Sequence, residues 1–196
     1  AEQGFNSVRR FGYVRDNFTK AEVMQDLPGS LAIGHVRYST AGSKGSTAIR
    51  DVQPFFGEFS MGGAAIAHNG NLTNTGDLAE LVQKLDADAP KNARGATTDT
   101  EIMTALIGLQ DEKNVEASAL AVLPKLEGAF SLVFMDERTL YAARDRHGVR
   151  PLVIGKLDRG WVVASESAAL DIVGAAFVRE VEPGEFIAID QDGLRA

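Results

Sequence analysis

Asn69 and Gly70 are the residues whose types and order most directly suggest chemistry. They follow His68 and a short apolar run, residues 64–67, which is typical of a buried strand. Asn-Gly favours tight backbone geometry, because Gly has no Cβ and Asn can bond its own backbone. We therefore expect a turn over residues 68–71 that aims N–H groups and the Asn69 carboxamide into a cleft. Fixed donors of this kind stabilise a tetrahedral oxyanion, although an ordinary strand-to-helix connection has the same local pattern.

Arg37 and Asp99 are charged residues with both a functional and a structural interpretation. Arg37 lies near the end of a predicted strand, residues 30–38, where a guanidinium can hold a carboxylate through two parallel hydrogen bonds. The structural interpretation of Arg37 is an ion pair with a Glu on the protein surface. Asp99 falls in the first turn of a helix that Thr98 and Glu101 begin as a capping box. There, an acidic residue also complements the helix dipole.

Composition excludes several classes of function. The 196 residues are 44% hydrophobic, which is enough for a core, and they contain no apolar run long enough to span a bilayer. The net charge of −7, with scattered Lys and Arg, argues against a nucleic-acid surface. With no Cys and three widely separated His, we expect no metal site, no Fe–S cluster and no cysteine nucleophile within these residues. A cytoplasmic protein is the expectation.

The helices expected to position these residues lie in the middle of the chain. Apolar residues at three- and four-residue steps predict three helices: one that Asn74 or Asp77 caps and that reaches Leu85, one over residues 98–109, and one over residues 115–126. A shorter helix is predicted from Lys20 to the residue before Pro28, with Thr19 and Glu22 as its capping box.

Strands are predicted on both sides of this helical block. The first covers residues 5–14, apart from a break at Gly12. After the helices, we expect an antiparallel meander over residues 129–135, 139–144, 152–157 and 160–165. A short helix over 168–173 and a hairpin of 177–181 with 185–189 complete the pattern. Without regular βαβ alternation, the predicted class is α+β: two packed antiparallel sheets with helices on their outer faces, in one domain over residues 1–196.

Several segments together resemble a known family. Residues 33–40 (IGHVRYST), 67–72 (AHNGNL) and 97–99 (TTD) resemble, in this order, class II glutamine amidotransferases, which are N-terminal-nucleophile hydrolases with an αββα sandwich. Later segments resemble the glutaminase domain of amidophosphoribosyltransferases, the enzymes that open purine biosynthesis. These segments are residues 128–131 (GAFS), 144–145 (RD), 148–152 (GVRPL), 163–167 (VASES) and 182–185 (EPGE).

The resemblance implies roles for residues at the matching positions. Arg37 would bind the α-carboxylate of glutamine and Asp99 its α-ammonium. Asn69 and the Gly70 backbone would form the oxyanion hole. Thr40 would line the glutamine pocket, and Tyr38 would form a pocket wall or an interdomain contact.

The chain departs from this family at the nucleophile. The family begins with a processed amino-terminal Cys that attacks the glutamine amide, and its own α-amine acts as base. Here residue 1 is Ala, and no Cys occurs. We therefore expect the sequence to be a piece of a larger enzyme, inactive as written. It would need no cofactor itself, whereas Mg²⁺, phosphoribosyl pyrophosphate and any Fe–S cluster would bind elsewhere in that enzyme. The family is usually homo-oligomeric.

Two alternatives stay open at this point. The first is another class II amidotransferase, of the glucosamine-phosphate synthase or asparagine synthetase type, because some of the later motifs occur there too. The second is a non-catalytic binding or assembly module that has lost its nucleophile and uses the cleft to sense a ligand.

Overall fold

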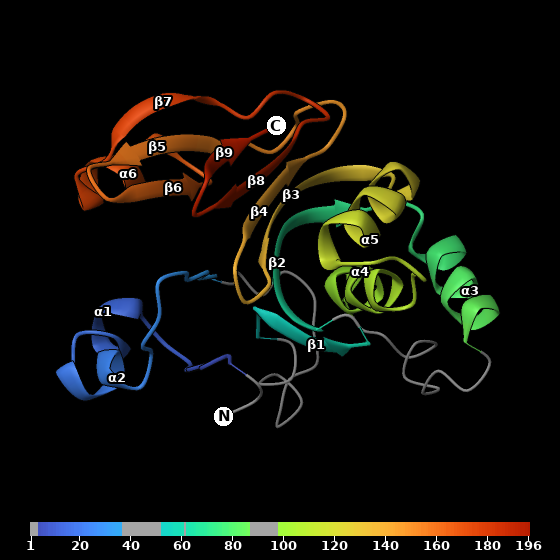
Figure 1. The fold of residues 1–196 in the computed structure, drawn as a ribbon, viewed down its shortest axis with the longest axis horizontal. Helices are drawn as coiled ribbons and strands as arrows, with labels where there is room; N and C mark the ends of the chain where they lie inside the picture. Colours follow the sequence, from blue (N-terminus) through green and yellow to red (C-terminus); the bar gives the residue numbers. More distant parts are fainter. Residues whose placement is uncertain (1–3, 37–51, 61, 87–97) are drawn as a thin grey trace.

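A computed structural model describes residues 4–36, 52–60, 62–86 and 98–196 (Figure 1). Within them, the larger sheet has six strands in the order β1-β2-β3-β4-β8-β9, and every neighbouring pair is antiparallel. Its strands are β1 (Phe55–Phe59), β2 (Gly62–Leu72), β3 (Gly128–Met135), β4 (Leu140–Arg144), β8 (Phe186–Asp190) and β9 (Gly193–Arg195). The eleven-residue β2 is the longest of them.

A second sheet has three strands in the order β6-β5-β7. They are β5 (Val153–Leu157), β6 (Gly160–Ala164) and β7 (Ala176–Glu180). The strand positions in this half of the chain are as predicted, but their pairing is not. β4 pairs with β8 rather than with β5, and β7 pairs with β5 rather than with β8. Within the predicted meander, β3 pairs with β4 and β5 with β6 as expected. The β4–β5 step and the final hairpin are wrong, because the chain changes sheets between β4 and β5 and again between β7 and β8.

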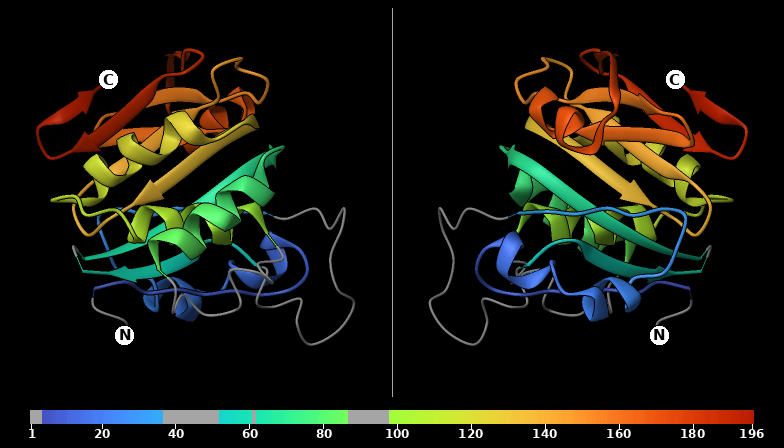
Figure 2. Two further views of the ribbon diagram at one scale, coloured as in Figure 1. Left: turned by 90° about the vertical axis from the view of Figure 1, so that its right-hand side faces the viewer. Right: turned by 90° about the vertical axis from the view of Figure 1, so that its left-hand side faces the viewer.

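The two sheets pack face to face with helices outside them, which confirms the predicted α+β sandwich (Figure 2). Side chains alternate between the two faces of a strand. Ile66, Leu132 and Phe134 face the helices α3 (Thr75–Leu85), α4 (Asp99–Gly108) and α5 (Val115–Val122) in the main core. On the opposite face, Ala142 and Ile187 pack against Ile154 of the second sheet. α6 (Ser167–Val173) covers the outer face of that sheet through Leu170.

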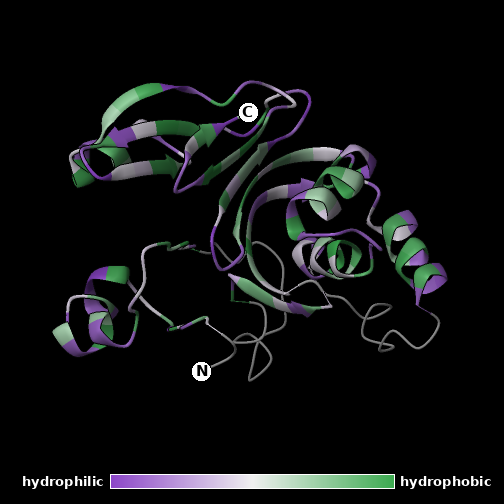
Figure 3. Cartoon of the chain, viewed as in Figure 1, coloured by the Kyte–Doolittle hydropathy of each residue, from purple (hydrophilic) through white to green (hydrophobic). Residues whose placement is uncertain are grey.

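Colouring by hydropathy shows apolar residues along the strands of both sheets, whereas apolar and polar residues alternate along α3 (Figure 3). The predicted helix over 115–126 ends earlier as an α-helix, at Val122, and continues as a short 3-10 turn, η3 (Leu123–Lys125), which contains Pro124. Pro124 lacks the N–H that a continuing α-helix would use.

The amino-terminal region holds two short helices, α1 (Val14–Asn17) and α2 (Ala21–Gln25). They lie on the far side of the larger sheet from α3, α4 and α5 (Figure 1). The predicted strand over residues 5–14 is wrong: within it Phe5 forms an isolated bridge, residues 6–10 have no regular structure, and Val14 begins α1. The Asn17 side-chain amide donates to the carbonyls of Phe11 and Tyr13 and closes the helical turn. The predicted helix near Lys20 is confirmed, but its N-cap is Lys20, without a side-chain cap from Thr19.

Candidate functional site

Residues 68–71 do not form the predicted turn. They continue β2 and pair with β3, with Asn69 opposite Ser131 and Gly70 opposite Phe130. The local preference of Asn-Gly for a turn is overridden by the partner strand. One part of the prediction holds, since Gly70 adopts a positive φ of 150°.

Gly70 cannot be replaced without moving the neighbouring strand. A Cβ at this position would overlap the carbonyl oxygen of Ala129 and lie 2.8 Å from the Cα of Phe130. Both are backbone atoms of β3, so no side-chain rotation relieves the contact. Gly therefore lets the two strands approach closely at this point.

Beyond Ile66, β2 presents backbone groups on the edge facing away from β3. β1 pairs with β2 only as far as Ile66. The next N–H groups directed to this edge find side-chain partners: His68 N–H donates to Gln53 Oε1 at 2.6 Å, and Leu72 N–H donates to Asp99 Oδ2 at 2.7 Å. Because alternate residues of a strand direct their N–H groups to the same edge, Gly70 N–H lies between these two.

The Gly70 N–H is available as a donor. Its opposite residue, Phe130, uses its own backbone groups toward the other side: its carbonyl accepts from Asp145 N–H, and its N–H donates to Asp145 Oδ2. Gly70 N–H points away from β3, like those of His68 and Leu72, and none of the described side chains accepts a hydrogen bond from it. We call the edge formed by residues 68–72, with Gln53 and Asp99 at its two ends, the donor edge.

Asp99 is placed at the donor edge by the start of α4. The Thr98 hydroxyl accepts a hydrogen bond from Glu101 N–H, as the capping prediction required. This cap sets the first turn of α4, where Asp99 bonds Leu72 N–H through one carboxylate oxygen. Asp99 therefore lies at the end of β2 that carries Asn69 and Gly70.

His68 is buried on the helix-facing side of β2. Its Nδ1 lies 3.5 Å from the buried Thr100 hydroxyl, and its Nε2 is buried without a partner in the described part of the chain. Burial lowers the pKa of His68 to about 4; Asp99 opposes this shift, whereas His35 and Arg150 add to it. The imidazole is therefore neutral at neutral pH.

Asn69 lies on the opposite face, and its side chain is exposed. Ser131, the residue opposite it, directs its hydroxyl to the carbonyls of Arg150 and Pro151. The turn that carries Arg150 is organised by the buried Asp145 carboxylate, which accepts the N–H groups of His147 and Val149.

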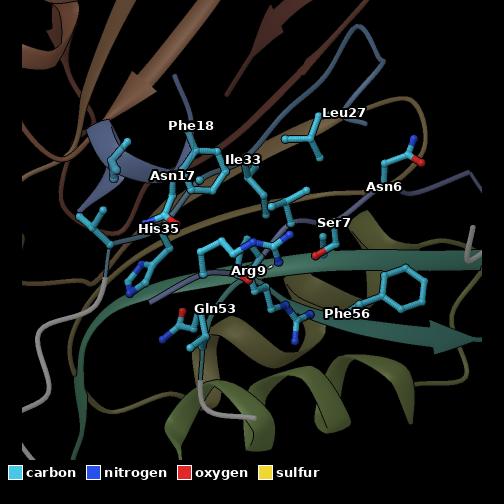
Figure 4. A pocket seen from close by; sticks show the side chains of 18 of the residues that line it. Asn6, Ser7, Arg9, Asn17, Phe18, Leu27, Ile33, His35, Gln53 and Phe56 are labelled. Carbon is cyan, nitrogen blue, oxygen red and sulfur yellow. Dashed lines mark hydrogen bonds between the residues drawn. The ribbon is translucent and has the colours of Figure 1, made fainter. Parts of the chain in front are cut away.

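A cavity of about 360 Å³ adjoins the Gln53 end of the donor edge (Figure 4). It is lined by the amino-terminal segment, by residues 33–36 and by residues 52–54, and its polar lining includes Arg9, His35 and Gln53. No carboxylate is among its described lining residues.

Three predicted site residues, Arg37, Tyr38 and Thr40, lie outside the described residues. Their roles stay predictions. His35, two residues before Arg37 in the sequence, lines the cavity and contributes to lowering the pKa of His68.

Sequence reasoning gave no role to Gln53, Thr100 or Asp145. Gln53 lies 15 residues from its partner His68, and no local pattern marks that pairing. Asp145 belongs to the motif of residues 144–145, and an Asp before a turn can accept the backbone N–H groups of that turn, so this role could have been predicted.

No group of three or more His, Cys, Asp or Glu side chains among the described residues could hold a metal ion. None of the described helices is both long and apolar enough to cross a bilayer.

Comparison with known proteins identifies the family. A family model described as "Glutamine amidotransferase domain" matches residues 36–172, well over half of the chain. The chain is 51% identical over 178 residues to an amidophosphoribosyltransferase of Mycobacterium leprae, covering 89% of this chain and 31% of that protein. It is 42% identical over 192 residues to the chloroplastic amidophosphoribosyltransferase 2 of Arabidopsis thaliana, covering 96% of this chain and 32% of that protein.

Solved structures agree with this assignment. The glutamine phosphoribosylpyrophosphate amidotransferase of B. subtilis superimposes with a TM-score of 0.75 at 34% identity, over 88% of this chain and 35% of that one. A structure titled as the allosteric regulatory enzyme of purine biosynthesis superimposes with a TM-score of 0.79 at 35% identity. The match covers 94% of this chain and 38% of that one. The chain spans about a third of the length of these relatives. With this sandwich and this donor edge, the chain belongs to the glutamine amidotransferase domain family.

Proposed function

We propose that this chain is the glutamine-hydrolysing part of an amidophosphoribosyltransferase. The whole enzyme would release ammonia from glutamine and pass it to C1 of phosphoribosyl pyrophosphate, giving phosphoribosylamine, glutamate and pyrophosphate. The observation that carries the proposal is the donor edge, where the available Gly70 N–H lies beside a fixed carboxylate, Asp99. The names of the relatives described above favour this enzyme over other class II amidotransferases.

The donor edge would act on the amide end of glutamine. When a nucleophile attacks the side-chain amide, its carbonyl oxygen gains negative charge. Gly70 N–H and the Asn69 carboxamide would donate to that oxygen. Donors fixed in a sheet need no reorganisation as charge develops, so they stabilise the transition state more than the substrate.

The charged residues would hold the amino-acid end. One oxygen of Asp99 accepts from Leu72 N–H, and the other, which has no partner among the described residues, would accept from the substrate's α-ammonium. Arg37 would bind the α-carboxylate, and Thr40 and Tyr38 would complete the pocket. Opposite charges at the two ends of this recognition site select a zwitterion and fix its direction.

The nucleophile and the acceptor chemistry would be supplied from outside these 196 residues. No Cys occurs among them, so the attack is assigned to an amino-terminal Cys of the full-length protein. The proposal gives this chain no metal or cofactor of its own. It assigns Mg²⁺, phosphoribosyl pyrophosphate and any Fe–S cluster to the remainder of the enzyme.

The proposed enzyme is a cytoplasmic homo-oligomer with neither a nucleic-acid nor a membrane partner. The acidic composition and the small-molecule substrates support this part of the proposal.

The experiment measures products of the full-length protein. With glutamine and phosphoribosyl pyrophosphate, glutamate and pyrophosphate should form in equal amounts, and ammonium salts should replace glutamine as the nitrogen source. Glutamate formation coupled to amination of a different acceptor would assign the domain to another amidotransferase. Binding of glutamine without any hydrolysis would favour a ligand-sensing module.

A further inference from the structure

The His68 side chain joins β2 to α4 at the candidate site. It is 6% exposed and lies on the face of β2 that packs against α4. Its Nδ1 faces the Thr100 hydroxyl at 3.5 Å, and Thr100 is itself buried. Thr100 is the second residue of α4 and directly follows Asp99.

Two connections therefore fix the first turn of α4 against β2. The first is the contact of His68 with Thr100, and the second is the hydrogen bond from Leu72 N–H to Asp99. On β2 they lie two residues before and two residues after Gly70. Two contacts on β2, four residues apart, restrict rotation of this turn more than either contact alone, and together they limit the movement of Asp99 relative to β2.

We infer that His68 is a positioning residue: through Thr100 it holds the Asp99 carboxylate at a constant distance from Gly70 N–H. This inference rests on the proposed function, since the distance matters only if one substrate bridges both groups. Glutamine would do so, with its ammonium at Asp99 and its amide oxygen at Gly70. A misplacement of about 1 Å between two binding groups can cost about 100-fold in rate.

The surroundings of His68 argue against a direct role in proton transfer. The ring is enclosed between the sheet and α4, whereas the donor at Gly70 lies in the plane of the sheet, at its edge. Three charged or titratable groups act on the ring: Asp99, His35 and Arg150. Their effects oppose one another, and burial dominates, so the ring stays neutral.

Matched substitutions isolate the His68–Thr100 contact. Thr100→Val keeps the shape of Thr100 and removes its hydroxyl. His68→Leu removes both ring nitrogens, whereas His68→Asn restores a polar atom at the position of Nδ1. The full-length protein is assayed with L-glutamine and with glutaramate, which has the same amide and carboxylate but no α-ammonium.

The positioning role predicts a loss confined to the substrate that uses Asp99. Thr100→Val and His68→Leu should each lower kcat/KM for L-glutamine about 10- to 100-fold and leave that for glutaramate nearly unchanged. The double variant should lose no more than either single variant, because both act through one contact. His68→Asn should recover most of the loss, and synthesis from ammonium salts should be unchanged in all of them.

Equal losses with both substrates, accompanied by lower ammonium-dependent synthesis, would overturn the inference in favour of a purely structural role. So would additive losses in the double variant, or unchanged kinetics. If Thr100→Val does not fold, the comparison of His68→Leu with His68→Asn carries the same test. A wild-type protein that does not hydrolyse glutamine would refute the proposed function itself, which is a different result from unchanged variants.

Discussion

The carboxylate of Asp99 accepts a 2.7 Å hydrogen bond from the backbone N–H of Leu72, which lies 27 residues earlier in the chain. The bond places a negative charge at the edge of β2, two residues beyond Gly70. The Thr98 cap starts α4 at Asp99, and this start directs the Asp99 carboxylate toward the sheet. Asp99 therefore does more than complement the dipole of α4: its carboxylate is also part of the candidate site.

Gly70→Ala should lower the free energy of unfolding by about 3 kcal/mol or more, because a Cβ meets backbone atoms of β3 and φ is positive. Urea unfolding at fixed pH measures the change. Gly76→Ala in α3 is the matched control, since a Cβ there has no neighbour within 4 Å and the helix favours Ala by about 1 kcal/mol. Similar stabilities for the two variants would contradict the proposed close approach of β2 and β3.

Stability should fall as the pH drops from 6.5 toward 4, because His68 is neutral in the folded protein and protonates in the unfolded chain. Its pKa is lowered from 6.5 to about 4, so its contribution is fully present above 6.5 and is lost toward 4. The expected loss over this range is about 3 kcal/mol. Urea unfolding at a series of pH values measures it, with His68→Asn as the comparison. Parallel pH dependence in the two proteins would show that His68 is not responsible.

Asp145→Asn should destabilise the protein by about 2–4 kcal/mol, since the amide cannot accept all three N–H groups that the buried carboxylate accepts. These come from Phe130, His147 and Val149. Thermal unfolding measures the effect. Asp192→Asn serves as control, because Asp192 lies on an exposed turn. A change no larger than that of the control would argue against Asp145 as the organiser of this turn.

Local sequence signals predicted the elements of this fold well. The apolar run before His68, the Thr98 cap and the helical periodicity around Leu78 and Val82 all depend on neighbouring residues, and each corresponds to an observed element. The α+β sandwich followed from their order.

Long-range pairing was the part that local signals could not provide. Asn69-Gly70 favours a turn in isolation, but β3 supplies partners that keep it in the sheet. Strands β4 and β5 are close in sequence yet belong to different sheets, because the Asp145 turn redirects the chain between them. Gln53 reaches His68 only through the fold.

The most direct test of the central claim, that Asp99 binds the α-ammonium of glutamine, is the KM for glutamine of Asp99→Asn in the full-length protein. Asp77→Asn is the matched control, because Asp77 also lies in the first turn of a helix, where it is exposed to solvent. If Asp99 binds the α-ammonium, Asp99→Asn raises this KM about 10- to 100-fold, corresponding to one lost charged hydrogen bond, while synthesis from ammonium salts and the Asp77→Asn control stay near wild type. An unchanged KM for glutamine in Asp99→Asn would show that Asp99 does not bind this group.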